Sequence, residues 1–275
     1  MATPTEGIRH SVIAGSWYPG TPKQLQGMIQ GFLDQVAPRT LEDKVVGLIS
    51  PHAGYAYSGL VAAHAYAQLR PQAFTRVAVI SPVHRMYPGR FATTSMSAYE
   101  TPLGLVPVDA ELVQAIEGLI ELNRVAVDEE HSLEIQLPFL QHVLGEFRLT
   151  PIMMGEQDWA SDVELGHALA KAIGKQRVLL VASTDLSHFH RYEQAVHLDQ
   201  VVLDRISAFD PEGLVRVLAA RKAEACGGGP VAAVMVAARA LGANRAVVLK
   251  YMNSGDVTGD QSSVVGYGAA ALLRV

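Results

Sequence analysis

Three apolar runs of this chain are each followed, after a short turn that contains serine, by a histidine: His52, His84 and His188. Short apolar runs bounded by turn residues are typical of parallel strands that are buried on both faces. Ligands of open α/β sheets bind beyond the carboxyl ends of such strands. We therefore expect the three histidines to share one crevice that carries a polar reaction centre.

Two of these histidines occur in closely similar contexts, Ser50-Pro51-His52 and Ser81-Pro82-Val83-His84. Neutral imidazole is the commonest protein ligand of transition metals. Two histidines from neighbouring strand ends, together with a third ligand, would form a metal site with open coordination positions, suited to Fe(II), Zn(II) or copper. The alternative is that each imidazole only forms a hydrogen bond within its own turn.

The third histidine has a carboxylate close to it, because Asp185 precedes His188 by three residues. A carboxylate at this spacing, in a loop or a first helical turn, can orient an imidazole or stabilise its charge. The pairing indicates a general acid or base rather than a third metal ligand. Ser183, Thr184 or Asp185 could also cap a following helix, and the two roles are compatible.

The single cysteine, Cys226, precedes three glycines and a predicted helix. Unpaired N–H groups at a helix start lower the pKa of a thiol, and the resulting thiolate can be a nucleophile or a soft metal ligand. An inert buried cysteine is the alternative. A further polar cluster contains Glu130 and His131. These residues either enter the site from a loop or belong to an acidic segment that complements the start of a helix.

Strand and helix patterns alternate along almost the whole chain, which predicts an α/β fold. We expect a three-layer α/β/α sandwich with a mixed, mainly parallel sheet, and a single domain over residues 1–275 because no long Ser/Gly/Pro-rich linker interrupts the chain. The predicted strands cover residues 45–49, 77–80, 149–154, 178–182, 246–252 and 264–273, with a hairpin between 90 and 109. The predicted helices cover residues 21–36, 110–122, 133–144, 161–173, 191–208, 211–220 and 231–241, and another follows Gly59.

The composition excludes several classes of protein. The chain has 275 residues, is 49% hydrophobic and carries a net charge of −5, so it has enough apolar residues to form a globular core. Its basic residues are scattered, which argues against nucleic acid or an anionic membrane as a partner. It contains no apolar run as long as a membrane span. One cysteine cannot form an internal disulfide, so we expect a cytoplasmic location.

Six motifs in order make the chain resemble the Memo family, whose bacterial and archaeal members are called AmmeMemoRadiSam system protein B. This family is similar in fold to the LigB-type class III extradiol dioxygenases, which hold non-haem Fe(II) with two histidines and a glutamate and use another histidine as acid and base. The motifs that carry the resemblance are Ala14-Gly15-Ser16-Trp17-Tyr18-Pro19, Pro51-His52-Ala53-Gly54-Tyr55, Ser81-Pro82-Val83-His84, Glu130-His131-Ser132-Leu133-Glu134, Ser183-Thr184-Asp185-Leu186-Ser187-His188 and Ala225-Cys226-Gly227.

The resemblance implies that His52, His84 and Cys226 are the metal ligands, and that His188 is the acid/base group with Asp185 beside it. Cys226 stands where the dioxygenases have a carboxylate, and a thiolate favours softer metals and can itself be oxidised. We expect iron or copper rather than zinc, and a redox, dioxygenase-like metalloenzyme. The family also implies AMMECR-type and radical-SAM partner proteins. The alternatives are a scaffold that binds a peptide, a small molecule or an anion in the same crevice, and a zinc hydrolase.

Overall fold

A nine-stranded mixed sheet forms the centre of the protein in the computed structural model, which describes residues 7–37, 41, 45–85 and 87–275. The strands lie in the order β10-β12-β2-β9-β3-β8-β4-β7, and β11 pairs with the other side of β12. Their bounds are β2 Val45–Ser50, β3 Arg76–Pro82, β4 Phe91–Thr94, β7 Asn123–Val125, β8 Arg148–Met154, β9 Leu179–Ser183, β10 His188–His190, β11 Arg245–Asn253 and β12 Val264–Leu273.

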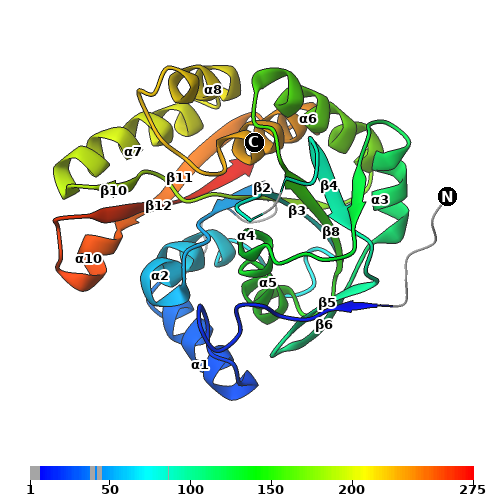
Figure 1. The fold of residues 1–275 in the computed structure, drawn as a ribbon, viewed down its shortest axis with the longest axis horizontal. Helices are drawn as coiled ribbons and strands as arrows, with labels where there is room; N and C mark the ends of the chain where they lie inside the picture. The colour runs from blue at the N-terminus through cyan, green and yellow to red at the C-terminus, as the bar shows by residue number, and fades with distance from the viewer. Residues whose placement is uncertain (1–6, 38–40, 42–44, 86) are drawn as a thin grey trace.

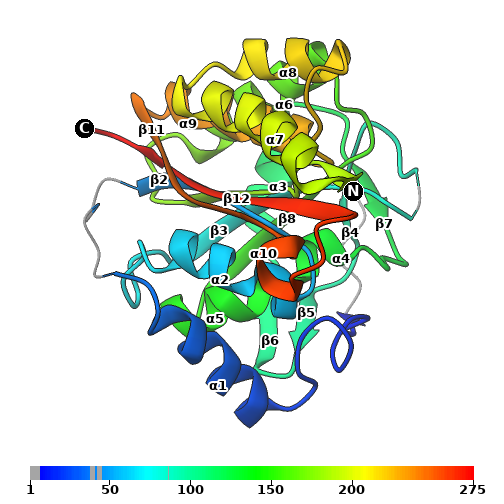
Figure 2. The same cartoon turned by 90° about the vertical axis from the view of Figure 1, so that its left-hand side faces the viewer.

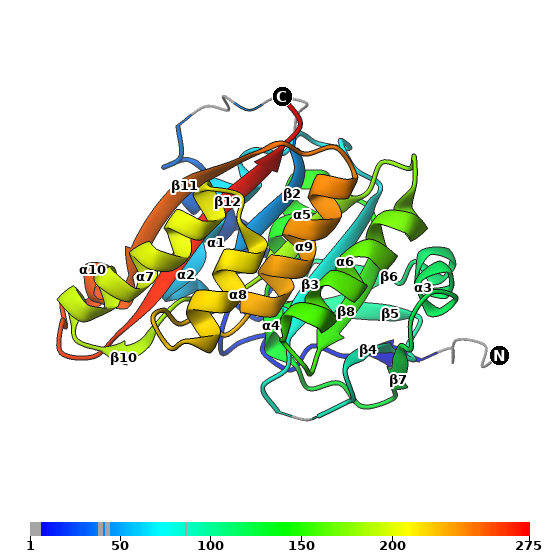
Figure 3. The same cartoon turned by 90° about the horizontal axis from the view of Figure 1, so that it is seen from above.

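Helices cover both faces of this sheet, so the molecule has three layers (Figure 2). On one face lie α3 Ala110–Glu117, α6 Trp159–Ile173, α7 Tyr192–Ser207, α8 Pro211–Ala219 and α9 Gly228–Ala240. Figure 3 shows α6 to α9 lying over the strands. On the other lie α1 Pro22–Leu33, α2 Tyr55–Tyr66, α4 His131–Glu134, α5 Leu137–Leu144 and α10 Ser254–Thr258. Each face has its own apolar core. Among the described helices, none is long and apolar enough to cross a membrane.

The centre of the sheet is parallel, because β2, β9, β3 and β8 run in the same direction. Antiparallel pairs occur at β12 and between β4 and β8. The strands of this centre are apolar and almost fully buried, as expected for strands with helices on both faces. In register, Ser50 at the end of β2 lies opposite Ser183 at the end of β9. The loops that follow these strands therefore start from the same edge.

A small second sheet and the N-terminal segment complete the face that carries α1. β5 Ala98–Thr101 and β6 Gly104–Pro107 form an antiparallel hairpin, and β1 Ile8–Arg9 pairs with β5 in parallel. The blue N-terminal segment in Figure 1 runs from β1 towards α1. The hairpin predicted between residues 90 and 109 is confirmed.

The sequence prediction of a mixed α/β sandwich is confirmed, and three local expectations are corrected. The helix predicted over 133–144 is two helices, because Pro138 lacks the N–H that a continuous helix needs and is favoured in the first turn of α5. The helix expected after Gly59 begins earlier, at Tyr55. No helix starts at residues 183–185 in the described chain; a loop leads from there to β10, so the capping role considered for Asp185 is wrong.

Candidate metal centre

Three histidines meet at the carboxyl ends of the central strands. His52 lies just after β2, His84 lies just after β3, and His131 is the first residue of α4, which packs against β3. One possible ligand atom from each side chain lies within 4.8 Å of the other two. The ring centroids of His52 and His84 are 5.2 Å apart, and that of His131 is 5.7 Å from His52 and 4.7 Å from His84.

The hydrogen bonds around Ser183 determine which nitrogen of His52 carries the proton. Ser183 Oγ donates its single hydrogen to the carbonyl of Ser132 at 2.6 Å, since a carbonyl can only accept. The hydroxyl oxygen must therefore accept from its other neighbours. His52 Nδ1, at 3.0 Å, donates to it. This leaves Nε2 of His52 with a free lone pair for a metal.

Gln136, which directly precedes α5, completes the hydrogen-bond network around Ser183. Its Nε2 donates to the carbonyl of Pro51 at 2.9 Å and to Ser183 Oγ at 2.8 Å, and its Oε1 accepts from Tyr66 at 2.7 Å. Because the Pro51 carbonyl requires a donor, the orientation of the amide is determined. Gln136 is buried, so the turn that carries His52 is held by a network that solvent does not reach.

Glu130 serves two of the three histidines. Its carboxylate accepts from Nδ1 of His84 at 3.0 Å and from the backbone N–H of His84 at 2.6 Å. It also accepts from the backbone N–H groups of His131 and Ser132, and so caps α4. Burial opposes ionisation of Glu130, but the hydrogen bonds from His84 and from these backbone groups outweigh it and lower the pKa of Glu130 to about 2. The carboxylate is therefore ionised and fixes Nδ1 of His84 as a donor.

The donor set fits a transition metal. Burial lowers the pKa of His52 well below its usual value, with a further contribution from His84, and burial lowers the pKa of His131 to about 4. Both imidazoles are thus neutral, the form that binds metals. Nδ1 of His131 is buried and has no hydrogen-bond partner within the described chain, although it lies 3.1 Å from Glu130 Oε1. Buried polar atoms without partners are rare, and a bound ion is one of the reasons for which they occur.

Cys226 adjoins this cluster through His52. Its Sγ lies 3.0 Å from Nε2 of His52, the nitrogen that the Ser183 network leaves free, and it accepts from the backbone N–H of Asp185 at 3.2 Å. Burial raises the pKa of the Cys226 thiol, and the nearby Asp185 adds to this effect. The lowered pKa predicted from the helix start is therefore wrong for the protein without a metal, because desolvation outweighs the helix dipole.

Asp185 and His188 lie next to the cluster, with different contacts. The Asp185 carboxylate accepts from the backbone N–H groups of His52 at 2.7 Å and Ala53 at 3.3 Å, so it fixes the His52 turn. Burial raises the pKa of Asp185 to about 7, although these two hydrogen bonds act to lower it. Burial also lowers the pKa of His188. His188 and Cys226 line a common open hollow of about 510 Å³, whose apolar side includes Leu186.

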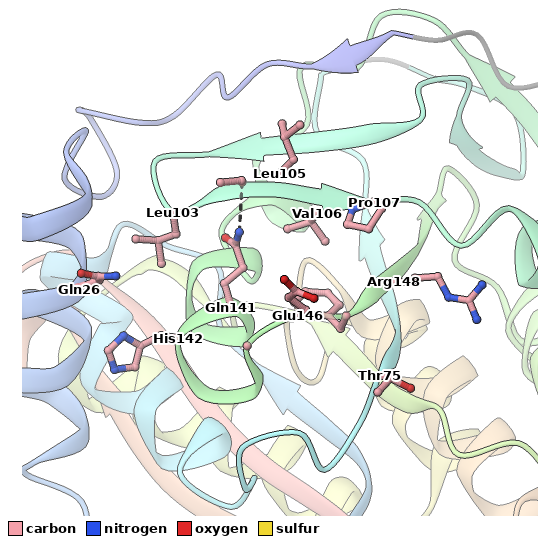
Figure 4. A pocket seen from close by; sticks show the side chains of 13 residues that line it. Gln26, Thr75, Leu103, Leu105, Val106, Pro107, Gln141, His142, Glu146 and Arg148 are labelled. Carbon is pink, nitrogen blue, oxygen red and sulfur yellow. Dashed lines mark hydrogen bonds between the residues drawn. The ribbon is translucent and has the colours of Figure 1, made fainter.

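A further cavity lies in another part of the protein. It measures about 1030 Å³ and lies between the β5–β6 hairpin and the C-terminal end of α5, close to Arg148 at the start of β8 (Figure 4). In this view the Gln141 side chain reaches the Gly104 carbonyl across one side of the cavity. Because Arg148 and the histidine cluster are at opposite ends of the parallel strands, this cavity belongs to a different part of the molecule.

The structure brings together His52 and His84, as the strand pattern predicted, and places Cys226 against His52. Whether His52, His84 and Cys226 are the actual ligands, with His188 and Asp185 as the catalytic pair, stays a prediction. Sequence reasoning left Glu130 and His131 undecided and missed Ser183 and Gln136. The short spacing Glu130-His131-Ser132 was the available signal, but a helix cap and a metal site produce the same pattern.

The fold and the site define an α/β/α protein with a histidine-lined centre at the carboxyl ends of its parallel strands. Residues 9–271 match the Memo-like protein family, and the chain belongs to this family. A MEMO1 family protein of Methanosarcina mazei is 41% identical over 95% of this chain and 98% of its own length. Another, from Methanothermobacter thermautotrophicus, is 40% identical over 94% of this chain and 98% of its own length.

A solved structure supports the fold. The crystal structure of an uncharacterized protein from Escherichia coli K12 superposes with a TM-score of 0.52 and covers 82% of this chain and 98% of its own. The two chains are 15% identical, so the likeness concerns the arrangement of strands and helices alone.

Proposed function

We propose that this protein is a non-haem metal protein of dioxygenase-like fold that binds iron or copper at His52 and His84. The observation that carries the proposal is the convergence of three imidazoles, with one possible ligand atom of each within 4.8 Å of the others. The third donor is His131, which adjoins both of them, or Cys226, which adjoins His52. A thiolate donor favours copper or iron over harder ions.

The residues around the centre have distinct tasks in this proposal. Ser183 and Glu130 keep the Nδ1 protons of His52 and His84 in place, which leaves the Nε2 lone pairs for the metal. His188, with its lowered pKa, is neutral near pH 7 and can accept a proton from a substrate in the adjoining hollow. Trp17 packs against His131, with ring centroids 4.3 Å apart, and so covers one side of this imidazole. A bound iron or copper ion would supply Lewis acidity and one-electron redox chemistry.

Metal binding by anaerobically purified protein tests the proposal. We expect the wild type to bind about one equivalent of Fe(II) or Cu(I), and His52→Ala and His84→Ala to lose at least tenfold in affinity. His131→Ala and Cys226→Ser identify the third donor, because the variant that loses the ligand should bind the metal more weakly than the variant that loses only a neighbouring group. His190→Ala is the matched control, since His190 pairs with Glu224 outside the cluster. Equal binding by the wild type and His52→Ala would refute the proposal.

The predicted pairing with AMMECR-type and radical-SAM proteins stays a proposal that rests on the family resemblance. Co-purification of the chain with each protein tests it. Binding that is lost in the presence of an unrelated competitor protein would count against it.

A further inference from the structure

A buried charged cluster lies behind the metal centre, and the function proposed above does not use it. Its members are Arg9 of β1, Asp128 in the loop before α4, and Glu134 at the end of α4. Their side chains are 3%, 1% and 0% exposed. Burying three charges costs several kcal/mol in desolvation, and apolar residues at such positions are often as stable or more stable. A role beyond stability is therefore expected.

Arg9 holds the main chain of the loop that carries Glu130 and His131. Its Nε donates to the carbonyl of Asp128 at 3.0 Å and its Nη2 donates to the carbonyl of Glu130 at 2.8 Å. Its Nη1 forms an ion pair with Glu134. One guanidinium thus fixes the backbone on both sides of residue 129 and the end of the short helix that starts at His131.

This backbone leads directly to the metal centre. The carboxylate of Glu130 accepts hydrogen bonds from Nδ1–H of His84 and from the backbone N–H of His131. Asp128 adds a second restraint, because its Oδ1 accepts from the N–H of Glu130 at 2.8 Å. A shift of the Glu130 backbone would therefore move the group that orients His84.

The segment that follows Arg9 touches a second ligand loop. Glu134 accepts from the N–H of Val12 at 3.0 Å and from Tyr18 Oη at 2.6 Å, which ties residues 9–18 to α4. The carbonyl of Trp17 accepts from the N–H of Tyr55 at 2.8 Å, three residues after His52. The N-terminal segment thus connects the His52 loop to the loop that carries His131.

We infer that Arg9 is a positioning residue of the metal centre, acting through the backbone and carboxylate of Glu130 on His84. The inference rests on the proposed metal binding. Arginine suits the role because its planar fork can reach two carbonyls and a carboxylate at once, whereas a lysine offers a single point of charge. Arg9→Lys therefore keeps the charge and removes the fork.

Cobalt(II) binding tests the inference, because the d–d spectrum of the bound ion reports ligand geometry without any turnover. We expect Arg9→Lys to weaken Co(II) binding about 10- to 100-fold and to change the spectrum. The matched control is Arg76→Lys. Arg76, at the start of β3, forms a partly buried ion pair with Asp109 at the other end of the strand from His84. Its Co(II) affinity and spectrum should equal those of the wild type.

The outcomes separate this inference from the proposed function. If the wild type binds none of Co(II), Fe(II) and Cu(I), the proposed function fails. If the wild type binds and Arg9→Lys binds with the same affinity and spectrum at a temperature where both are folded, Arg9 has no positioning role. Should Arg9→Lys not fold, Tyr18→Phe removes one hydrogen bond to Glu134 from the same cluster and is expected to weaken binding in the same direction. Wild-type binding by Tyr18→Phe would then overturn the inference.

Discussion

Replacing Ser183 by alanine tests the hydrogen-bond network that holds His52. The hydroxyl donates to the Ser132 carbonyl and accepts from His52 Nδ1 and Gln136 Nε2. Ser183→Ala removes all three hydrogen bonds at a site that is 0% exposed. A buried polar group without a partner costs about 1–3 kcal/mol, and Gln136 keeps its hydrogen bond to Pro51. We therefore expect the free energy of unfolding to fall by about 3 kcal/mol.

Ser81→Ala is the matched control for this substitution. Ser81 also lies near the end of a central strand and is 0% exposed, but its Oγ has no hydrogen-bond partner among the described residues. Its removal should change the free energy of unfolding by less than about 1 kcal/mol, because no hydrogen bond is lost. Urea unfolding of the metal-free proteins measures both values. Equal stabilities of the two variants would refute the network described around Ser183.

The same pair of variants tests the proton position on His52. Without Ser183 Oγ, Nδ1 has no fixed acceptor, and the tautomer with the proton on Nε2 becomes accessible. We expect the affinity for Fe(II) to fall about 10- to 100-fold in Ser183→Ala and to be unchanged in Ser81→Ala. Reduced stability with full metal affinity in Ser183→Ala would show that the hydroxyl supports the fold alone.

Three further predictions concern the metal, the Cys226 loop and a buried carboxylate. Fe(II) at 100 times its dissociation constant should raise the free energy of unfolding by about 2.7 kcal/mol, and a chelator should reverse this; an unchanged melting temperature would count against metal binding to the native state. Gly227→Ala should lower the free energy of unfolding by about 3 kcal/mol or more, because the new Cβ would press on the Ser183 carbonyl. Gly27→Ala, in the exposed part of α1, should leave the free energy of unfolding unchanged or raise it, and urea unfolding measures both values. Burial raises the pKa of Asp162 to about 7, so the folded state binds the proton more tightly and the free energy of unfolding falls as pH rises from about 4 to about 7. Asp162→Asn should remove up to about 4 kcal/mol of this pH dependence, and parallel profiles of stability against pH for the variant and the wild type would contradict the prediction.

The approach of His52 and His84 follows from strand patterns alone, because the carboxyl ends of all the parallel strands of one sheet lie at the same edge. The sequence order of the strands did not give their spatial order, in which β9 lies between β2 and β3. Nor could it show that Ser183 at the end of β9 would face His52. That contact depends on the register between two strands that are far apart in the chain, since Ser183 and His52 are separated by 131 residues.

The interpretation of Cys226 failed for a different reason. A position before a helix start indicates a lowered thiol pKa only if the thiol stays partly solvated. Here Cys226 is only partly exposed, and the partial loss of solvation raises the pKa of its thiol. Burial depends on how the α8–α9 loop packs against β9, which local sequence does not encode. A metal would reverse the balance, since coordination deprotonates a thiol outright.

The segment around Glu130 shows why a helix cap and a functional site need not be alternatives. A capping carboxylate must accept from backbone N–H groups at the helix start, which Glu130 does for His131 and Ser132. Those hydrogen bonds also keep it ionised and in one position. An ionised, immobile carboxylate suits the second nitrogen of a metal-binding histidine, and the contact between Glu130 and Nδ1 of His84 fits the metal site proposed above. The cap therefore serves the site, and the Arg9 cluster behind it can act on the metal centre without touching a ligand.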